Sequence, residues 1–317
     1  MKNDPCFFLH SNTCPRIMTS SNGLILGRST KCNSEIELFI SNPATKSWLP
    51  IPTLNCLKEN PDFDINIAFE CNQDSELGFM LCLFEVPDEW SSSCYGLKFY
   101  SQKEGIWKRF EKSFFIGDRP MRFDMHVFYN KAFHFISNCF PFLSKKSLYF
   151  RPYIMSYNIE DGGSRMIRLP KEARRGSHDS SCEMGIYKWG KARNSDESIC
   201  LVRLRKCVFS VWILIDYEAS KWRKVLKIRV KAILGMKEEE PIIVRGFIVM
   251  NGDYLVFATK KKVYSYGLGY ENYMKLQEIC DHKFDDDADK VCFTSYSDTL
   301  RLCGNGATTL PLMQQAY

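Results

Sequence analysis

The fold is decided by a short stretch of the chain, LFISNPATKSWLP at residues 38–50. An apolar run is followed by a polar turn, and a tryptophan then begins a second run. Asparagine and proline are typical of turns, whereas β-branched and aromatic side chains favour strands. The stretch therefore predicts a β-hairpin.

The same pattern recurs four more times, at residues 97–108, 154–167, 212–223 and 263–274. The residue near the start of each second run is large and apolar, and these anchors are Trp48, Trp107, Met166, Trp222 and Met274. They lie 59, 59, 56 and 52 residues apart. A period of about 50 residues is typical of four-stranded kelch-type blades. Each interval leaves room for two further strands before the hairpin.

These repeats predict an all-β fold, a kelch-like β-propeller with five clear four-stranded repeats. One sheet cannot cover both of its faces, so we expect blades to pack against one another, with the anchors filling the seams. The apolar runs at 291–296 and 299–302 predict a sixth blade, completed by Phe7-Phe8-Leu9 near the N-terminus. We expect a single domain over residues 1–317, closed by its termini.

Composition supports a globular chain without a membrane or nucleic-acid partner. Hydrophobic residues make up 45% of 317 residues, and the net charge is +6 with the basic residues scattered among acids. A nucleic-acid binder usually shows a clustered excess of positive charge. No apolar run approaches the roughly 18–20 residues that cross a bilayer. The N-terminus lacks a signal peptide, which indicates a cytoplasmic and/or nuclear protein.

The fourteen cysteines are spread along the chain without a Cys-x-x-Cys pair. Several lie inside apolar runs, such as Cys82 and Cys200. Buried free cysteine behaves as a small hydrophobic residue. We therefore expect reduced thiols.

No catalytic or metal-binding constellation is visible, so we expect no enzyme, no cofactor and no metal. His126 and His134 flank a turn and could be neighbours, but two histidines do not make a zinc or copper site. The acidic run at 285–289 lacks the pattern of an EF-hand loop. We expect this run to form a solvated surface loop.

Candidate binding segments are chosen by their loop character alone. They are Pro87–Ser93, Ser137–Lys146 and Lys171–Ser181, and residues 170–175 predict a single helical turn. The basic run Arg203-Leu204-Arg205-Lys206 fits a strand with one face in water. The three lysines at 260–262 fit a turn.

Residues 20–26, SSNGLIL, followed by residues 37–52, ELFISNPATKSWLPIP, resemble the opening of the F-box-associated domain of plant F-box proteins. Residues 211–217, together with Trp222 and residues 227–228, are similar to a later blade of that family. The resemblance runs from about Cys14 to Leu302. We expect structural roles, in turn geometry and seam filling, for the signature positions Asn22, Gly23, Asn42, Pro43, Trp48, Pro50, Trp107, Trp212 and Trp222.

The resemblance implies a protein–protein interaction module, the substrate-recognition domain of an SCF-type, cullin-based E3 ubiquitin ligase, with a protein target. In the family an F-box docks on the ligase adaptor and precedes the propeller. Only about 18 residues precede Thr19 here, without a helical leucine-rich pattern, so we expect no adaptor binding by that route. The alternatives are a kelch-like propeller enzyme, a carbohydrate-binding propeller, and an F-box-less decoy or degenerate product.

Overall fold

A computed structural model describes residues 16–30, 36–52, 65–71, 78–86, 93–139, 146–177, 179, 181–190, 197–235, 242–268, 275–282, 291–294, 296, 298–301, 303 and 308–309. The chain divides into two compact units. Unit 1 comprises Met1–Trp90, Tyr95–Ser113 and Thr294–Tyr317, and unit 2 comprises Ser91–Cys94 and Phe114–Phe293. Apart from two short helices, every regular element in the described residues is a β-strand.

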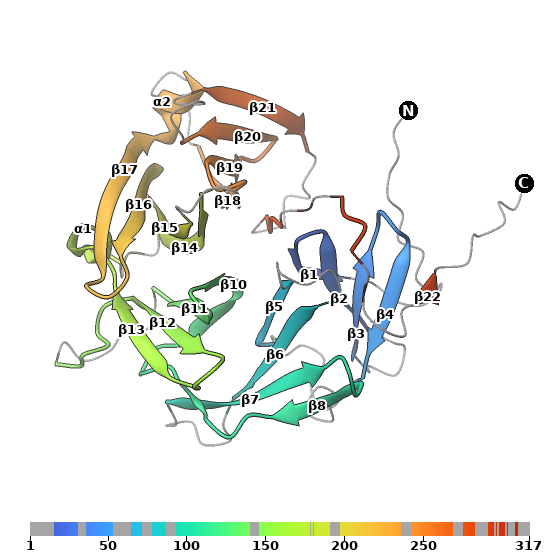
Figure 1. Ribbon diagram of the computed structural model, residues 1–317. Coiled ribbons are helices and arrows are strands. Elements are labelled where there is room, and N and C mark those ends of the chain that lie inside the picture. Colours follow the sequence, from blue (N-terminus) through green and yellow to red (C-terminus); the bar gives the residue numbers. More distant parts are fainter. Residues whose placement is uncertain are drawn as a thin grey trace, which may run out of the picture. The chain divides into compact units, whose positions relative to one another are not determined.

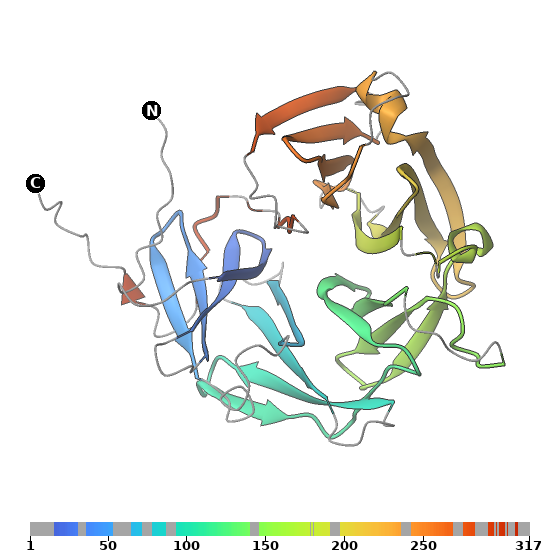
Figure 2. The same ribbon diagram turned by 180° about the vertical axis from the view of Figure 1, so that it is seen from behind.

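Unit 1 contains two antiparallel sheets, here called blades, whose strands pair in chain order (Figure 1). Blade 1 consists of β1 (Arg16–Ser21), β2 (Leu24–Thr30), β3 (Ile36–Asn42) and β4 (Ser47–Ile51). Blade 2 consists of β5 (Ile67–Cys71), β6 (Phe79–Glu85), β7 (Cys94–Ser101) and β8 (Ile106–Arg109). Figure 2 shows the same strands from behind, those of blade 1 in blue and those of blade 2 in teal.

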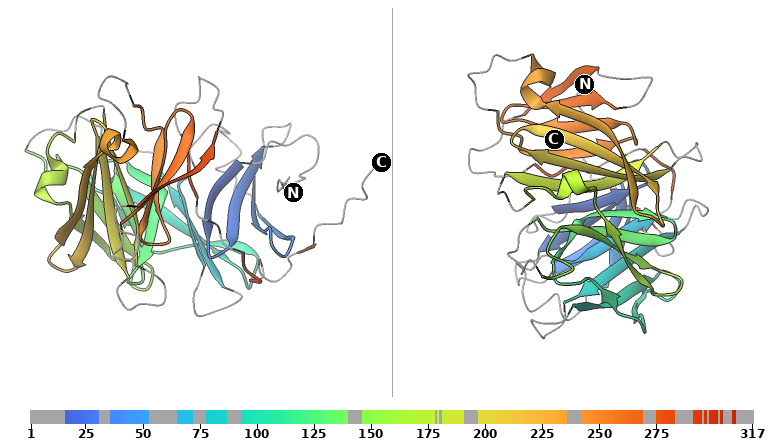
Figure 3. Two further views of the ribbon diagram at one scale, coloured as in Figure 1. Left: turned by 90° about the horizontal axis from the view of Figure 1, so that it is seen from above. Right: turned by 90° about the vertical axis from the view of Figure 1, so that its left-hand side faces the viewer.

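Unit 2 contains three blades built in the same way. Blade 3 consists of β10 (Met121–Tyr129), β11 (Ala132–Ser137), β12 (Tyr153–Asn158) and β13 (Ser164–Arg168). Blade 4 consists of β14 (Cys182–Trp189), β15 (Ser198–Arg205), β16 (Val208–Asp216) and β17 (Lys221–Arg229). Blade 5 consists of β18 (Gly246–Met250), β19 (Tyr254–Ala258), β20 (Lys262–Gly267) and β21 (Leu276–Asp281). The unit also holds β9 (Phe114–Phe115), α1 (Lys171–Arg174) and α2 (Val230–Leu234). Seen edge-on in Figure 3, the strands of each blade are twisted, as expected for β-sheets.

The five predicted hairpins are confirmed as the last two strands of the five blades. Asn42 pairs with Ser47 at the tip of the first hairpin, for example, and Asp216 pairs with Lys221 at the tip of the fourth. Met274, the fifth anchor, lies outside the described residues, and β21 begins at Leu276. The all-β class and the five four-stranded repeats are therefore confirmed, while the kelch-like character stays a prediction.

The apolar core lies between neighbouring blades within each unit. Strand side chains alternate between two faces, so each blade presents apolar residues on both sides. Phe209 and Phe257, both fully buried, belong to the cluster between blades 4 and 5. Ile136 and Leu201 belong to the cluster between blades 3 and 4. Burial of one such side chain contributes about 1.5–3 kcal/mol to stability. Packing between blades therefore stabilises sheets that could not bury both of their faces alone.

The predicted sixth blade is not supported by the structure. Its first two strands were expected at 291–296 and 299–302, but the described residues there form no strand. Residues 299 and 301 instead accept hydrogen bonds from the Asn42 side chain in blade 1. Farther on, β22 (Thr308–Thr309) pairs with β4 as an additional edge strand of blade 1. Residues 7–9, expected to complete the blade, lie outside the described residues.

Candidate functional site

The signature residues Asn22 and Gly23 form the turn between β1 and β2. Their backbones are left-handed, with φ of 45° and 81°, as a tight two-residue hairpin turn requires. The Asn22 amide also donates a hydrogen bond to the carbonyl of Cys71 at the end of β5, at 3.4 Å. The pair therefore closes one hairpin and contacts the next blade of its unit.

Asn42 is fully buried at the end of β3 and holds two segments together. Its Oδ1 accepts a hydrogen bond from the Ala44 N–H at 2.9 Å, which shapes the β3–β4 turn. Its Nδ2 donates to the carbonyls of Thr299 and Arg301, at 2.9 and 2.7 Å. Pro43 lies in the same turn. The structure thus gives Asn42 a part in turn geometry and in anchoring the C-terminal segment.

Two signature tryptophans make the same contact in different units. The Trp107 indole N–H in β8 donates to the carbonyl of Pro52, directly after β4, at 2.8 Å. The Trp222 indole N–H in β17 donates to the carbonyl of Arg168, at the end of β13, at 2.9 Å. In both cases the last strand of one blade is tied to the end of the last strand of the preceding blade.

The other signature residues each face a residue of their own blade, and Trp212 also belongs to the apolar cluster between blades 3 and 4. Trp48 stacks on Phe39, with ring centroids 4.3 Å apart. Pro50 is exposed in β4, opposite the same Phe39. Trp212 is buried in β16, and the Lys224 ammonium lies 5.6 Å from the centre of its ring. The structural roles expected for these residues stay a prediction.

His126 and His134 do not form a joint site. His134 pairs in register with Val127, the neighbour of His126, so the two rings point to opposite faces of the blade. His134 is fully buried, with Nδ1 3.2 Å from the carbonyl of Val127 and Nε2 2.9 Å from the Tyr217 hydroxyl. Burial lowers the pKa of His134 to about 4. Within the described part of the chain, no group of three or more His, Cys, Asp or Glu side chains could hold a metal ion.

The cysteines that the structure describes are all free. Cys82 and Cys200 are buried in β6 and β15, and burial raises the pKa of Cys82 to about 12 and that of Cys200 further. Both therefore stay protonated and pack as apolar side chains.

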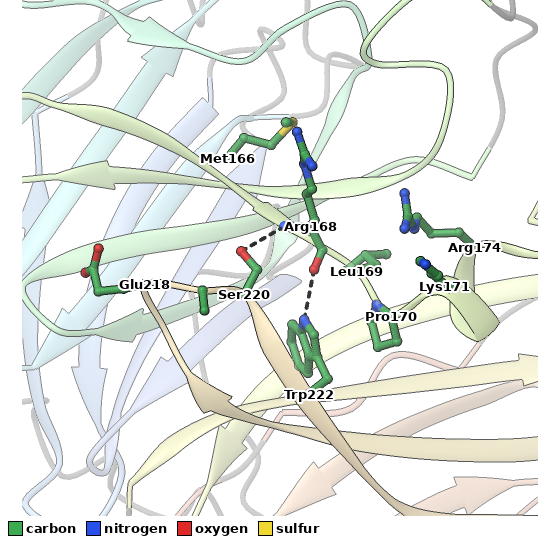
Figure 4. A pocket seen from close by; sticks show the side chains of 10 residues that line it. Met166, Arg168, Leu169, Pro170, Lys171, Arg174, Glu218, Ser220 and Trp222 are labelled. Atoms are coloured by element: carbon green, nitrogen blue, oxygen red, sulfur yellow. Dashed lines mark hydrogen bonds between the residues drawn. The ribbon is translucent and has the colours of Figure 1, made fainter.

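An open groove lies in unit 2 where the end of β13 and α1 meet the turn between β16 and β17 (Figure 4). Its volume is about 650 Å³. Figure 4 shows Lys171 and Arg174 on one side and Glu218 on the opposite side, with Arg168 and Trp222 between them. The lining residues are Met166, Arg168, Leu169, Pro170, Lys171, Arg174, Glu218, Ala219, Ser220 and Trp222.

One side of the groove carries a concentration of positive charge. Arg168 and Lys171 are exposed, Arg174 is half-buried, and Arg151 donates to the Arg174 carbonyl at 2.9 Å. Burial lowers the pKa of Arg174, and the nearby charges of Arg151 and Arg168 lower it further. The Arg174 Nε is buried without a hydrogen-bond partner. This wall can accept an anionic group.

Two arginines of β15 contact the segment that follows β13. Arg203, largely buried, donates to the carbonyls of Glu172 and Arg175 at 2.8 and 2.7 Å. Arg205 pairs with Asp179 at 3.2 Å. The prediction that this basic run faces water was wrong for Arg203. Its guanidinium is buried because it donates hydrogen bonds to carbonyls of the α1 turn, which lie outside any strand ladder. Residues 171–174 do form the predicted single helical turn.

The opposite side of the groove is closed by a charged pair. Arg165 and Glu218 lie 2.5 Å apart, and Arg165 also donates to the Glu218 carbonyl at 2.8 Å. The Arg165 guanidinium lies over the Tyr217 ring, 5.0 Å from its centre. The Arg168 N–H donates to the Ser220 hydroxyl at 3.3 Å. The β16–β17 turn is thereby fixed against β13.

Of the three predicted binding loops, Lys171–Ser181 borders this groove through Lys171 and Arg174. Residues 87–92 and 140–145 of the other two lie outside the described residues. Buried Arg119 holds described neighbours of the second loop, donating for example to the carbonyls of Tyr149 and Asn138 at 2.7 and 3.0 Å. Sequence reasoning missed Arg168, although a signal existed. Five basic residues and one acidic residue occur in residues 165–175.

The repeated four-stranded blades and the seam contacts define a β-propeller class of protein. A family model described as "F-box protein At3g26010-like, beta-propeller" matches residues 5–307. The chain belongs to this family, and the predicted resemblance to the propeller domain of F-box proteins is confirmed. Neither helix in the described residues has the length or apolar character needed to cross a membrane.

Comparison with curated proteins gave no match. Among solved structures, the chain is similar to a mutant of AofleA from Arthrobotrys oligospora, with 9% identity, 88% of this chain and 81% of that chain covered, and a TM-score of 0.47. It is also similar to oligopeptidase B from Leishmania major, with 8% identity, 84% and 42% covered, and a TM-score of 0.46. The chain thus spans less than half of that peptidase. Neither likeness carries an argument about function.

Proposed function

We propose that the protein is a non-catalytic recognition module that binds a protein target, and that it serves a cullin-based ubiquitin ligase as its substrate-recognition propeller. The observation that carries this proposal is the family match over residues 5–307. A groove whose backbone is held by hydrogen bonds supports a binding role, because a preorganised backbone reduces the cost of association.

The mechanism is positional. Gripping a target beside the ubiquitin-transfer machinery raises the effective concentration of its lysines there, without new bond chemistry in the propeller. The propeller therefore needs a rigid surface and a selective groove, and no nucleophile or general base.

The test is a pull-down of the tagged, full-length protein from cells of its source, followed by quantitative mass spectrometry and ubiquitin-site profiling. We expect a reproducible protein target that carries less ubiquitin when the protein is depleted. A target that binds without any change in its ubiquitination would remove the ligase part of the proposal. Absence of any reproducible protein partner would remove the proposal as a whole.

A further inference from the structure

The cations of the groove in unit 2 have no acidic partners. Arg168 ends β13, Lys171 begins α1 and Arg174 ends it, so three positive charges fall within seven residues. Across the described part of the chain, no carboxylate forms an ion pair with any of the three. By contrast, the neighbouring Lys224 pairs with Glu172, and Lys262 of blade 5 pairs with Glu278 at 2.7 Å. Arg168, Lys171 and Arg174 therefore place three positive charges, without an ion-pair partner among the described residues, along one wall of the groove.

This arrangement has a cost that a ligand would relieve. Like charges near Arg174 disfavour its charged form, as does its partial burial. A buried N–H without a partner costs free energy comparable to a lost hydrogen bond. A bound carboxylate would neutralise part of the repulsion that Arg151 and Arg168 exert on Arg174.

The backbone that carries these cations is also held in place before any ligand arrives. Arg203 fixes both ends of α1 through the carbonyls of Glu172 and Arg175. Arg151 fixes the Arg174 carbonyl, and the Trp222 indole fixes that of Arg168. Little backbone ordering is then left for the binding step to supply.

We propose that this groove binds an extended acidic segment of the protein partner. Carboxylates of the segment pair with Arg168, Lys171 and Arg174, and an apolar side chain packs against Trp222 and Pro170. The planar guanidinium of arginine matches a carboxylate with two parallel hydrogen bonds. The proposal rests on the proposed protein-binding function and gives its target a chemical character.

The groove suits a peptide better than a nucleic acid. Met166, Pro170 and Trp222 contribute apolar surface, and the Glu218 carboxylate stands opposite the cations. A phosphate backbone presents regularly spaced negative charge and needs a continuous track of cations. Glu218 interrupts such a track, whereas a peptide can place a neutral residue beside it.

The experiment is a selection from a random peptide display library on the immobilised full-length protein. Winning peptides are then titrated, as labelled synthetic peptides, against three proteins. These are the wild type, the groove variant Arg168→Gln/Lys171→Gln/Arg174→Gln, and the control variant Lys46→Gln/Lys103→Gln/Lys261→Gln. The control removes the same charge from exposed turns of other blades. Circular dichroism and thermal unfolding confirm that each variant is folded.

We expect the winning peptides to be enriched in Asp and Glu. The groove variant should bind them about tenfold or more weakly, and the control variant should retain wild-type affinity. If the groove variant does not fold, the double variant Arg168→Gln/Lys171→Gln, which changes exposed side chains only, takes its place.

Selected peptides that are not enriched in Asp and Glu would overturn the groove assignment while leaving the protein-binding role intact. An equal loss of peptide affinity in the groove variant and the control variant would do the same. A single-stranded oligonucleotide could also displace the peptides and bind the wild-type protein more tightly than they do. That result would favour a nucleic-acid ligand and overturn the proposal. No selected peptide at all, together with recovery of a protein target from cells, would also reject this groove. Failure of both experiments would reject the recognition role itself.

Discussion

The seam between blades 1 and 2 in unit 1 and the seam between blades 3 and 4 in unit 2 are closed by the same kind of contact. In each, an indole N–H from the last strand of one blade reaches a carbonyl at the end of the preceding blade, Trp107 to Pro52 and Trp222 to Arg168. The repeat period of the chain places the two tryptophans in equivalent positions.

The surroundings of the two contacts differ. Trp107 packs edge-on against Tyr100, with centroids 5.7 Å apart, and Tyr100 stacks over Phe79. Trp222 instead lines the groove beside Arg168, Lys171 and Arg174. The repeat therefore supplies the same contact twice. The surroundings of Trp107 are aromatic, whereas those of Trp222 form a charged groove at the edge of an otherwise apolar seam.

The largest expected difference between the seams is their response to acid. His134 in blade 3 bonds to Tyr217 in blade 4, and burial lowers the pKa of this histidine from 6.5 to about 4. Above pH 6.5 it is neutral in both the folded and the unfolded state. As the pH falls from 6.5 to 4, only the unfolded state takes up the proton, so the free energy of unfolding should fall by about 3 kcal/mol.

Urea unfolding as a function of pH measures this fall, and His134→Gln should reduce it by that amount. Hydrogen exchange should locate the loss in blades 3 and 4, since no histidine lies in the described residues of unit 1. An identical pH dependence in the variant would show that other groups control acid stability.

The next largest effect is expected for Arg203, which supports the charged seam only. Arg203→Ala leaves the carbonyls of Glu172 and Arg175 without these donors and should lower the free energy of unfolding by about 2 kcal/mol. Chemical denaturation measures the loss, with exposed Arg223→Ala as a matched control that should change little. Equal losses in the two variants would argue against the clamp.

Removing the indole hydrogen bond should lower stability equally in the two seams. It should weaken peptide binding only in the seam between blades 3 and 4. Trp107→Phe and Trp222→Phe each lose one indole donor, at a cost of about 1 kcal/mol. Only Trp222→Phe releases the backbone of Arg168, so it alone should weaken binding of acidic peptides. Thermal unfolding and peptide titration separate the effects. A binding loss in Trp107→Phe would contradict the distinction between the seams.

The smallest effects are expected for surface ion pairs. Lys98→Gln breaks the pair with Glu85 in unit 1, and Lys224→Gln breaks the pair with Glu172 beside the groove. Each should cost less than about 1 kcal/mol, because such pairs are screened by solvent. Lys224→Gln also leaves the Glu172 carboxylate, next to the groove cations, with the longer 3.9 Å contact to Lys227. It should therefore weaken acidic-peptide binding, whereas Lys98→Gln should not. Titrations at low salt compare the two variants.

The sequence by itself determined the repeating architecture. Hairpin signals such as residues 38–50 are local, since turn chemistry and strand propensity act within a dozen residues. Recurrence of the pattern at a near-constant period then specified five blades, and the anchors Trp107 and Trp222 marked where seams would form. The sixth blade is not confirmed: the described residues from 291 to 303 form no strand, and the Asn42 side chain donates hydrogen bonds to the carbonyls of Thr299 and Arg301.

Only the tertiary structure decided where the charged groove lies and which cations line it. Arg168, Lys171 and Glu218 come from different strands and turns, and their juxtaposition depends on how blades 3 and 4 pack. The burial of Arg203 was likewise hidden, because a strand pattern of alternating Arg and Leu does not reveal that the α1 turn, about 30 residues earlier in the chain, covers the polar face. Hydrogen bonds between segments distant in sequence leave no local signal. Each donor or acceptor could equally well bond to water, so the sequence around it does not show which partner it finds in the fold.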